Sequence, residues 1–528
     1  MGKMKVLISD NLSPKGIEIL KKAGLEVDVK VGMKPDELRT SIGDYHGLVV
    51  RSATKVTPQI IDAAKNLKVV GRAGSGLDNV DIPAATRKGI VVMNTPGGNT
   101  ITTAEHTIAL MLALARQVPQ ATMSMKEGKW EKKRFTGVEL FNKTLGVIGI
   151  GKIGSQVAKR AQALAMNVIA YDPYLSEDRA NAIGVEKVDL EGLFSRSDFI
   201  TIHTPITPET KNLINKETIK KMKNGVRIIN CARGGIVNEK DLYDALVEGR
   251  VAGAALDVFE KEPPEGNPLM TLENLICTPH LGAATKEAQE NVAIAVAEQI
   301  VDYLINRTIR NAVNFPSIPV DQVAKLQPYI NLAEKIGVLA AQIFEGAMKE
   351  ITIEYYGEAS AVDTAAIKIA AIKGLLTPVL KEEVNFVNAP IIAKERGIEV
   401  KETKSAGAID YQSMIKIRIR AKDKESYFAG TLSSKKDPRI IAIDDFEVEI
   451  IPEGELLFIF NLDKPGVIGN IGTILGKHNI NIARMQFGRE APGGRAISVV
   501  TIDTPATLPI IEEIKGLPNI LSVKHITL

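Results

Sequence analysis

The sequence predicts an α/β protein in which two doubly wound parallel sheets are followed by an α+β unit and a ferredoxin-like βαββαβ module. Short β-rich apolar runs alternate with helical patterns over residues 5–280, as in parallel sheets with crossover helices. Pro316 and Pro319 then mark a linker. At about 150 residues per domain, the 528 residues leave room for three or four domains.

The first parallel sheet is expected from β-rich runs early in the chain, at residues 5–9, 24–29, 47–52, 67–74 and 89–97, with a helix at 14–23. One long helix is expected from Thr102 to about Met125, because Ala104, Ile108 and Met111 recur at helical spacing.

The second parallel sheet is expected from a further series of runs, at residues 144–151, 167–172, 199–205, 227–235, 252–259 and 275–280. Each run ends in polar or glycine residues. Because ligands bind at the carboxyl ends of such strands, the chemistry should lie there. A helix over 286–306 closes this region.

The C-terminal part reads differently. Residues 320–452 combine helices and strands, and one strand sets Lys416, Arg418 and Arg420 on the same face, which is either a solvated surface or an anion site. The last segment alternates as strand, helix, two strands, helix and strand, at residues 455–462, 465–478, 481–487, 495–502, 508–514 and 519–526.

The composition excludes several functional classes. Lys plus Arg (66) nearly balance Asp plus Glu (63), so neither nucleic acid nor membrane is an expected partner. The start, MGKMKVLISD, lacks the apolar region of a signal peptide, and residues 108–115 are far short of the ~20 residues that span a bilayer. Two cysteines, Cys231 and Cys277, predict no zinc site. We expect a cytoplasmic protein without a metal.

A glycine-rich turn predicts a dinucleotide site. Gly149, Gly151 and Gly154 lie between a predicted strand and a predicted helix. This spacing permits a tight turn, close approach of a pyrophosphate and tight helix packing. Asp172 ends the next strand, 18 residues after Gly154, near the ~20 expected for the carboxylate that binds an adenosine ribose. A Rossmann-like NAD site is favoured over NADP, and over glycines that only turn the chain.

Oxidation of an alcohol by NAD also needs a base for the hydroxyl proton, and histidine suits this role. His203 and His280 follow strands of the second series, and Glu262 lies 18 residues before His280. A buried carboxylate beside an imidazole fixes its tautomer, so we predict His280 as the acid/base with Glu262 as its partner. His203 should shape the cofactor crevice. Structural roles are expected for the other four histidines, His46, His106, His478 and His525.

Arg233 is predicted to bind a substrate carboxylate. It follows the strand RIIN, and arginine binds carboxylates through two parallel hydrogen bonds. Gly234 and Gly235 are expected to allow close approach of the ligand. The alternative is an ordinary surface arginine. Its position at a strand end, like those of Glu262 and His280, favours the binding role.

These motifs resemble those of the D-isomer-specific 2-hydroxyacid dehydrogenases: GIGKIG with Asp172, NCARGGIV, ALDVFEKEPP and TPHLGAAT. With RSATKVT, RAGSGLDNVD and NTPGGNT, the whole chain is similar to the long members that oxidise 3-phosphoglycerate in the phosphorylated route to serine. The resemblance implies NAD as cofactor and Arg233, Glu262 and His280 as catalytic residues. It also implies NAD contacts at Ser75, Gly149, Gly151, Lys152, Ile153, Gly154, Asp172, Thr204, Cys231, Asp257, His280 and Gly282.

The resemblance further implies a division into four domains: substrate-binding (1–98 and 286–314), NAD-binding (99–285), intervening (315–452) and ACT (453–528). The substrate should lie in a cleft between the first two, near Arg51, Ser52 and Asn99. Related enzymes send a basic residue from the segment of Lys132 into a neighbouring subunit's site, although this basic cluster could also be a solvated loop. A homo-oligomer is implied, with a tetramer favoured.

The terminal module resembles an ACT domain, a small-ligand sensor that pairs between subunits. Asn461, Asp463 and Asn481 stand where the family binds serine, which implies serine as an effector. Amide and carboxylate groups near a helix terminus suit the ammonium and carboxylate of an amino acid. Some relatives have a histidine at the position of Asn461. The alternative is a merely structural ACT module.

Two other functions stay open. The first is a glyoxylate, hydroxypyruvate or D-lactate reductase on the same fold, although such relatives generally lack the C-terminal sensor. The second is a non-catalytic, NAD-sensing protein of the corepressor type. The complete set of Arg233, Glu262 and His280 weakens the second alternative.

Overall fold

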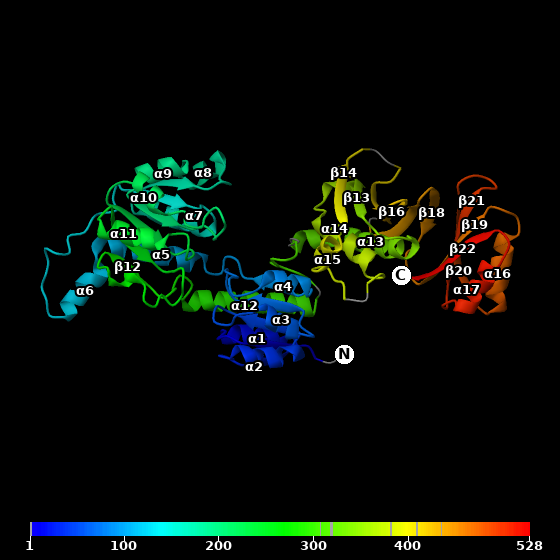
Figure 1. Ribbon diagram of the computed structural model, residues 1–528, viewed down its shortest axis with the longest axis horizontal. Coiled ribbons are helices and arrows are strands. Elements are labelled where there is room, and N and C mark those ends of the chain that lie inside the picture. The colour runs from blue at the N-terminus through cyan, green and yellow to red at the C-terminus, as the bar shows by residue number, and fades with distance from the viewer. Residues whose placement is uncertain (1–2, 307, 317–319, 381–382, 408–409, 435) are drawn as a thin grey trace.

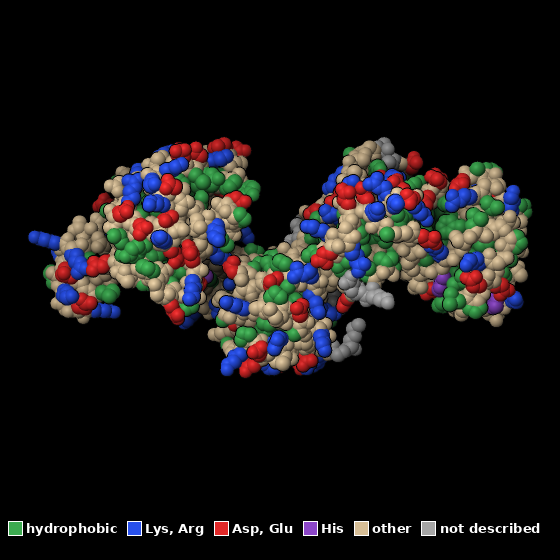
Figure 2. All heavy atoms as spheres, viewed as in Figure 1, with side chains coloured by type: hydrophobic (Ala, Val, Ile, Leu, Met, Phe, Trp, Pro, Cys, Tyr) green, Lys and Arg blue, Asp and Glu red, His purple; other side chains and the backbone are tan. Residues whose placement is uncertain are grey.

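The computed structural model describes residues 3–528 except 307, 317–319, 381–382, 408–409 and 435, so Pro319 lies outside the described residues. The molecule is elongated and contains four sheets, which we number in chain order. Along the long axis they lie in the order second, first, third and fourth (Figure 1). Lys and Arg side chains are interspersed with Asp and Glu on the visible face (Figure 2). Within the described part of the chain, no helix has the length and apolar character needed to cross a bilayer.

The first sheet is parallel, with strand order β2-β1-β3-β4-β5. Its strands are β1 (Lys5–Ile8), β2 (Glu26–Val29), β3 (Gly47–Val50), β4 (Val69–Arg72) and β5 (Val91–Asn94). One face packs on α1 (Pro14–Lys22) and α12 (Lys286–Leu304). The other packs on α2 (Pro35–Ser41), α3 (Pro58–Ala63) and α4 (Ile82–Arg87). A 3-10 turn, η1 (Ile42–Asp44), precedes β3.

The second sheet is also parallel, with strand order β12-β11-β10-β9-β6-β7-β8. Its strands are β6 (Thr144–Ile148), β7 (Asn167–Tyr171), β8 (Glu186–Lys187), β9 (Phe199–Ile202), β10 (Val226–Asn230), β11 (Val251–Leu256) and β12 (Leu275–Cys277). The order reverses beside β6, and such a reversal opens a ligand crevice at the strand ends.

Helices cover both faces of the second sheet. One face packs on α5 (Thr100–Arg116), α7 (Lys152–Ala163) and α8 (Glu177–Ile183). The other packs on α9 (Leu190–Arg196), α10 (Lys216–Lys221), α11 (Glu239–Val247) and η2 (Pro268–Thr271). Apolar side chains on both faces explain why these strands read as unbroken apolar runs rather than alternating ones.

The long helix expected over 102–125 is two helices, so that expectation is wrong in detail. The chain breaks between α5 and α6 (Val118–Lys126) at Gln117, which has a left-handed φ of 51°. Pro119 occupies the first turn of α6, where its missing N–H costs nothing. The apolar spacing continues across the break, which is why periodicity did not reveal it.

The third sheet is mixed, with strand order β14-β13-β15-β16-β17-β18; only β13 and β14 pair in parallel. Its strands are β13 (Glu350–Gly357), β14 (Glu399–Ser405), β15 (Ser413–Arg420), β16 (Glu425–Ser433), β17 (Asp437–Ile443) and β18 (Phe446–Ile450). The helical elements of this unit are α13 (Val320–Ile343), η3 (Glu358–Ala361), α14 (Ala365–Leu376) and α15 (Ala389–Glu395).

Two of the three cations on the basic face of β15 form ion pairs within the sheet, and the third, Lys416, lies over the Tyr427 ring with its Nζ 3.8 Å from the ring centroid. Arg418 pairs with Glu354 (3.1 Å) and Glu425 (2.6 Å), and Arg420 pairs with Glu350 (2.6 Å). This ladder of cross-strand ion pairs favours a solvated face over an anion site.

The fourth sheet is antiparallel, with order β20-β21-β19-β22 and the expected βαββαβ sequence. Its elements are β19 (Glu455–Leu462), α16 (Val467–Lys477), β20 (Ile482–Arg489), β21 (Arg495–Ile502), α17 (Leu508–Lys515) and β22 (Ile520–Thr527). One face packs on α16 and α17. The other face shares a hydrophobic cluster with the preceding unit, in which Leu456, Phe458 and Ile526 join Leu326 and Ile336.

Residues after α12 bind the first sheet before the chain leaves it. Ala312 forms an antiparallel bridge with Met93 of β5. The Asn314 side chain accepts from Val92 N (2.9 Å) and donates to Ile90 O (2.9 Å). The segment therefore extends the sheet at its β5 edge.

Gly16 lies where α1 packs against α12 in the first sheet unit. A substitution at this position therefore tests how closely the two helices pack. A Cβ at Gly16 would lie 2.7 Å from the Ala293 carbonyl oxygen. We expect Gly16→Ala to lower the free energy of unfolding by about 1–3 kcal/mol, since α1 and α12 must separate. Thermal unfolding should record this as a loss of several degrees.

Gly472→Ala in α16 is the control, because no heavy atom lies within 4 Å of the position that its Cβ would occupy. It should be neutral or slightly stabilising. A Gly16→Ala protein as stable as the wild type would contradict the close packing of α1 on α12.

Candidate active site

A cleft of about 710 Å³ lies between the carboxyl ends of the first and second sheets. The residues that line it follow β3, β4, β9, β10, β11 and β12, and α5, α7 and α12 complete the wall. It brings together many residues that the sequence singled out: Arg51, Ser52, Ser75, Asn99, Ile153, Thr204, Cys231, Arg233, Asp257, Glu262, His280 and Gly282.

The three glycines of the turn after β6 have different surroundings. A Cβ at Gly149 would lie 2.7 Å from the His203 carbonyl oxygen, and φ there is 88°. A Cβ at Gly154 would lie 2.0 Å from the Gly149 oxygen, whereas one at Gly151 would meet no heavy atom within 4 Å. The open space at Gly151, at the N-terminus of α7, fits a pyrophosphate.

Three further residues, Asp172, Thr204 and Lys152, lie where they could contact the rest of a dinucleotide. Asp172 follows β7 and holds the turn, accepting from Ile150 N (3.0 Å) and Tyr174 N (2.9 Å). The Thr204 hydroxyl lines the cleft, is buried and has no hydrogen-bond partner among the described residues. Lys152 begins α7 at the same edge. Bound NAD would therefore complete hydrogen bonds that this crevice leaves open.

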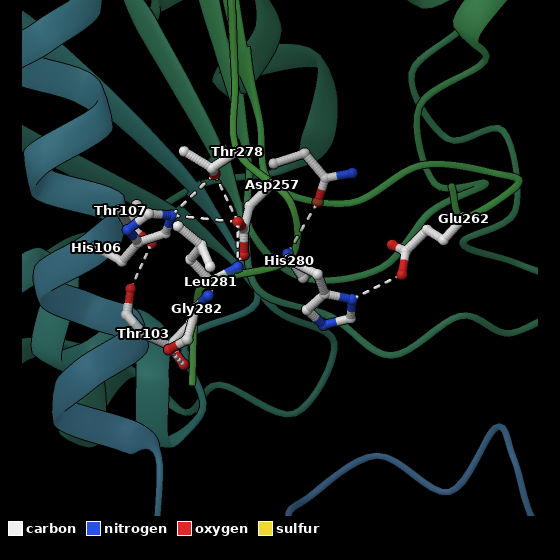
Figure 3. A network of polar contacts seen from close by, with 11 residues as sticks. Thr103, His106, Thr107, Asp257, Glu262, Thr278, His280, Leu281 and Gly282 are labelled. Atoms are coloured by element: carbon white, nitrogen blue, oxygen red, sulfur yellow. Dashed lines mark hydrogen bonds and ion pairs between the residues drawn. The ribbon is translucent and has the colours of Figure 1, made fainter. Parts of the chain in front are cut away.

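His280 and Glu262 form the pair that the sequence predicted. Nδ1 of His280 lies 2.8 Å from Oε2 of Glu262 (Figure 3). The other glutamate oxygen accepts from Phe259 N at 3.2 Å, which fixes the carboxylate. Because Nδ1 faces Glu262, Nε2 is the nitrogen left for a substrate. The expected burial of Glu262 is wrong, since its side chain is 40% exposed and that of His280 is 49% exposed.

His203 lies in the wall of the cleft and is the unsuitable base. Burial lowers its pKa to about 3. Its Nε2 lies 3.0 Å from the Thr201 hydroxyl, and its Nδ1 has no partner in the described part of the chain. A ring that stays neutral at physiological pH cannot serve as the imidazolium acid of the reverse reaction.

Arg233 is held in the cleft by its own loop and by Asp78, which follows β4 of the first sheet. Asn230 donates to the Arg233 carbonyl at 2.9 Å, and Nε of Arg233 lies 3.3 Å from Asp78 Oδ2. The expected reason for the glycines is wrong for Gly234. A Cβ there would lie 1.9 Å from the Phe259 carbonyl oxygen, so Gly234 lets this loop pack on the Glu262 loop rather than on a ligand.

Arg72 was not predicted from the sequence, and it lies deep in the same cleft at the end of β4. Burial and then the neighbouring Arg233 lower its pKa to about 10, so it stays charged at neutral pH. Arg51 and Lys55 line the cleft beside it. The sequence contained a signal for Arg72. It follows the apolar part of its β-rich run, as Arg51 and Arg233 follow the apolar parts of their own runs.

Ser75 and Asn99 meet at the junction of the two sheets. The Ser75 hydroxyl donates to Asn99 Oδ1 at 2.8 Å, and Asn94 donates to the Ser75 carbonyl at 2.7 Å. Asn99 immediately precedes α5, so this contact ties the end of the first sheet to the helix that enters the second.

Asp257 follows β11 and is only 1% exposed. Its carboxylate accepts from Leu281 N (2.6 Å), Gly282 N (2.8 Å) and the Thr278 hydroxyl (2.6 Å), and these hydrogen bonds help hold its pKa below the usual range despite burial. Cys231 lies nearby as a free thiol whose pKa burial raises to about 12, which makes it unreactive.

Other predicted residues do not reach this cleft. Lys132 lies on an exposed loop after α6. In the fourth sheet unit, Asn461 is buried and accepts from the Ser498 hydroxyl at 3.1 Å, and Asp463 accepts from Arg489 at 3.0 Å. Asn481 donates to Asp503 at 2.7 Å, beyond the far end of α16. The 11 residues of α16 span about 16 Å, so Asp463 and Asn481 lie at opposite ends of that helix.

Family models match three parts of the chain. The D-isomer specific 2-hydroxyacid dehydrogenase, NAD binding domain, matches residues 108–282. The D-3-phosphoglycerate dehydrogenase intervening domain matches 325–444, and the ACT domain matches 456–519.

Whole-chain relatives decide the family. The D-3-phosphoglycerate dehydrogenases of Archaeoglobus fulgidus and Methanocaldococcus jannaschii are each 48% identical to this chain, covering 99% of it and 100% of the relative. The chain belongs to the D-3-phosphoglycerate dehydrogenase family. The predicted fold class, the dehydrogenase activity and NAD as cofactor are thereby confirmed.

Among solved structures, the NAD-dependent formate dehydrogenase from Staphylococcus aureus in complex with NAD is 29% identical, with a TM-score of 0.55. The match covers 60% of this chain and 100% of the formate dehydrogenase chain. The first two sheet units of this D-3-phosphoglycerate dehydrogenase family member thus resemble an NAD-dependent dehydrogenase, and the third and fourth units match the intervening and ACT models.

Proposed function

We propose that the chain oxidises 3-phospho-D-glycerate to 3-phosphohydroxypyruvate, the first step of the phosphorylated route to serine. The observation that carries the proposal is the His280–Glu262 pair in the same cleft as Arg233 and two further arginines. The relatives named D-3-phosphoglycerate dehydrogenase support this substrate.

Each catalytic group has a distinct task. Arg233 binds the substrate carboxylate, and Nε2 of His280 takes the C2 hydroxyl proton while Glu262 stabilises the imidazolium that forms. NAD, when bound, supplies the acceptor for the C2 hydride. Gly151 and the N-terminus of α7 would hold its pyrophosphate, and Asp172 would hold its ribose. Further contacts would come from Ser75, Lys152, Ile153, Thr204, Cys231, Asp257 and Gly282.

The phosphate of the substrate is bound by the remaining cations. Arg51 and Arg72 line the side of the cleft that belongs to the first sheet, with Lys55 beside them. Ser52 and Asn99 add polar contacts there. Three cations beyond Arg233 match a phosphorylated substrate better than glyoxylate or lactate, which carry a single carboxylate.

The two rival functions fit less well. A glyoxylate reductase from Paecilomyes thermophila and the D-lactate dehydrogenase from Escherichia coli each cover 59% of this chain, with 27% and 28% identity. A reductase of that kind leaves the cations around Arg72 and the C-terminal units without a role. A corepressor-type protein leaves the oriented His280–Glu262 pair without one.

The enzyme is proposed to be a homo-oligomer, with a tetramer favoured. The segment of α6 and the following loop exposes Met123, Met125 and Trp130, the last 80% exposed. Such a surface is typical of protein interfaces. The basic cluster of this loop consists of Lys129, Lys132, Lys133 and Arg134. Lys129 and Arg134 pair with glutamates, whereas Lys132 and Lys133 have no acidic partner among the described residues, which leaves Lys132, the proposed residue, and Lys133 free to reach a neighbouring substrate.

Serine is the proposed effector of the ACT module, in a site formed by two subunits. Because Asp463 and Asn481 lie at opposite ends of α16, one chain cannot place both on a single amino acid. Two paired modules can bring Asn461 and Asp463 of one subunit to Asn481 of the other.

The proposed domain limits are 1–98 with 286–314 for substrate binding, 99–285 for NAD binding, 315–452 for the intervening domain and 453–528 for the ACT domain. A cytoplasmic location is also proposed, because the free thiols of Cys231 and Cys277 would stay reduced there.

The substrate and base are tested together. NADH oxidation should be fastest with phosphohydroxypyruvate and slow with glyoxylate and pyruvate. His280→Asn should lower kcat about 10²–10⁴-fold, with the NADH dissociation constant unchanged, because only proton transfer is lost. His478→Gln, outside the cleft, is the control. Turnover of none of the three acids would contradict the proposed activity, and an active His280→Asn enzyme would contradict the base.

Arg72→Met tests phosphate recognition. We expect KM for phosphohydroxypyruvate to rise about 10- to 100-fold, since a charge-assisted contact contributes about 1.5–3 kcal/mol. Any residual rate with glyoxylate should not change, because it carries no phosphate. Arg87→Met, on the outer helix α4, should behave as wild type. An equal loss with both substrates would assign Arg72 to another role.

Asn481→Ala tests the effector site. Calorimetry should record weaker serine binding, and serine should inhibit less, while turnover without serine is unchanged. Thr473→Ala, on the exposed side of α16, is the control. Unaltered serine binding by Asn481→Ala would refute this site.

A further inference from the structure

His106 lies in the middle of the largely apolar helix α5, where the sequence suggested only a structural role. Its side chain is 18% exposed and points at the segment that carries His280 (Figure 3). Nε2 lies 3.2 Å from Oδ1 of Asp257 and 3.1 Å from the Thr278 hydroxyl. Three residues earlier on α5, Thr103 donates to the Gly282 carbonyl at 2.7 Å. One helix thus contacts both ends of the segment 278–282.

Asp257 connects His106 to the backbone around His280. Its carboxylate receives the N–H groups of Leu281 and Gly282, the two residues that follow His280 directly. It also receives the hydroxyl of Thr278, two residues before His280. The orientation of this carboxylate therefore determines where the segment lies.

His280 needs such support because its backbone is in the left-handed region, with φ of 56°. A residue with a Cβ adopts this conformation only where its surroundings enforce it. The hydrogen bonds from residues 278, 281 and 282 to Asp257 supply that enforcement. They hold the turn from which the imidazole reaches Glu262.

The hydrogen-bond pattern fixes the proton on His106. An ionised carboxylate only accepts, and the Thr278 hydroxyl already donates to Asp257. Nε2 of His106 must therefore carry a proton, which it shares between Asp257 Oδ1 and the Thr278 oxygen. A donor at this position completes the shell of the buried carboxylate.

We propose that His106 is a positioning residue for the reaction: through its Nε2–H it orients Asp257 and Thr278, and thereby holds His280 in its productive place. The inference rests on the proposed function, in which His280 moves the proton. His106 touches neither substrate nor reacting atoms.

Three variants of the full-length enzyme test this role. His106→Gln introduces a side-chain amide whose N–H can lie near the position of Nε2, so this variant should keep kcat within about three-fold of wild type. His106→Leu removes the donor at similar volume, and the shorter side chain of His106→Asn cannot reach Asp257. Both should lower kcat for phosphohydroxypyruvate about 10- to 100-fold, because small displacements of a catalytic group have effects of this size.

The other readouts separate positioning from a general structural defect. KM for phosphohydroxypyruvate should stay near the wild-type value in all three variants, because Arg51, Arg72 and Arg233 lie on other segments of the cleft. In His106→Leu and His106→Asn the unfolding temperature should fall by a few degrees, because the buried Asp257 carboxylate loses a donor, but both proteins should stay folded at the assay temperature. If His106→Leu does not fold, His106→Asn carries the comparison with His106→Gln.

The inference is overturned by a wild-type kcat in both His106→Leu and His106→Asn. It is also overturned if His106→Gln is as slow as these two, since the retained donor would then have no effect. A wild-type enzyme inactive on every 2-oxo acid would overturn the proposed function and this inference with it. An active wild type with insensitive variants would overturn the inference alone.

Discussion

The buried carboxylate of Asp257 is the constraint on which the active-site side of the second sheet depends. A charge with almost no exposed surface must have its oxygens satisfied by nearby donors. Here those donors come from α5 and from the segment after β12, which are far apart in the sequence. The same interaction that makes burial of the charge tolerable also determines where His280 lies.

The cleft itself results from two sheets that present their carboxyl ends to each other. α12 makes this arrangement possible, because it follows the second sheet in the sequence but packs in the core of the first. Arg233 and the His280–Glu262 pair follow strands of the second sheet. Arg51 and Arg72 lie at strand ends of the first sheet, so no one strand carries the whole set.

Most of the fold and the centre of the site could be predicted from the sequence. Strand positions follow from apolar runs, the roles of Gly149, Gly151 and Gly154 follow from their spacing, and the His280–Glu262 contact follows from both lying at strand ends. Features that depend on packing between distant segments could not be predicted. The close approach of Gly234 to Phe259 and the exposure of Glu262 are of this kind. His106 illustrates the same limit most clearly, because its helix reads as apolar and its partners lie about 150 residues later. Arg72 differs, since its place at a strand end was visible in the sequence and only its depth was not.

The hydrophobic cluster shared by the third and fourth sheet units has a consequence for biosynthesis. Ile526 of β22 packs in the same cluster as Leu326 of α13. A nascent chain therefore exposes part of the apolar surface of α13 until β22 has been synthesised. The first two units have no such requirement, since their clusters contain residues only up to 387. On the ribosome, the first two sheet units can fold before β22 is available to complete the cluster shared by the third and fourth units.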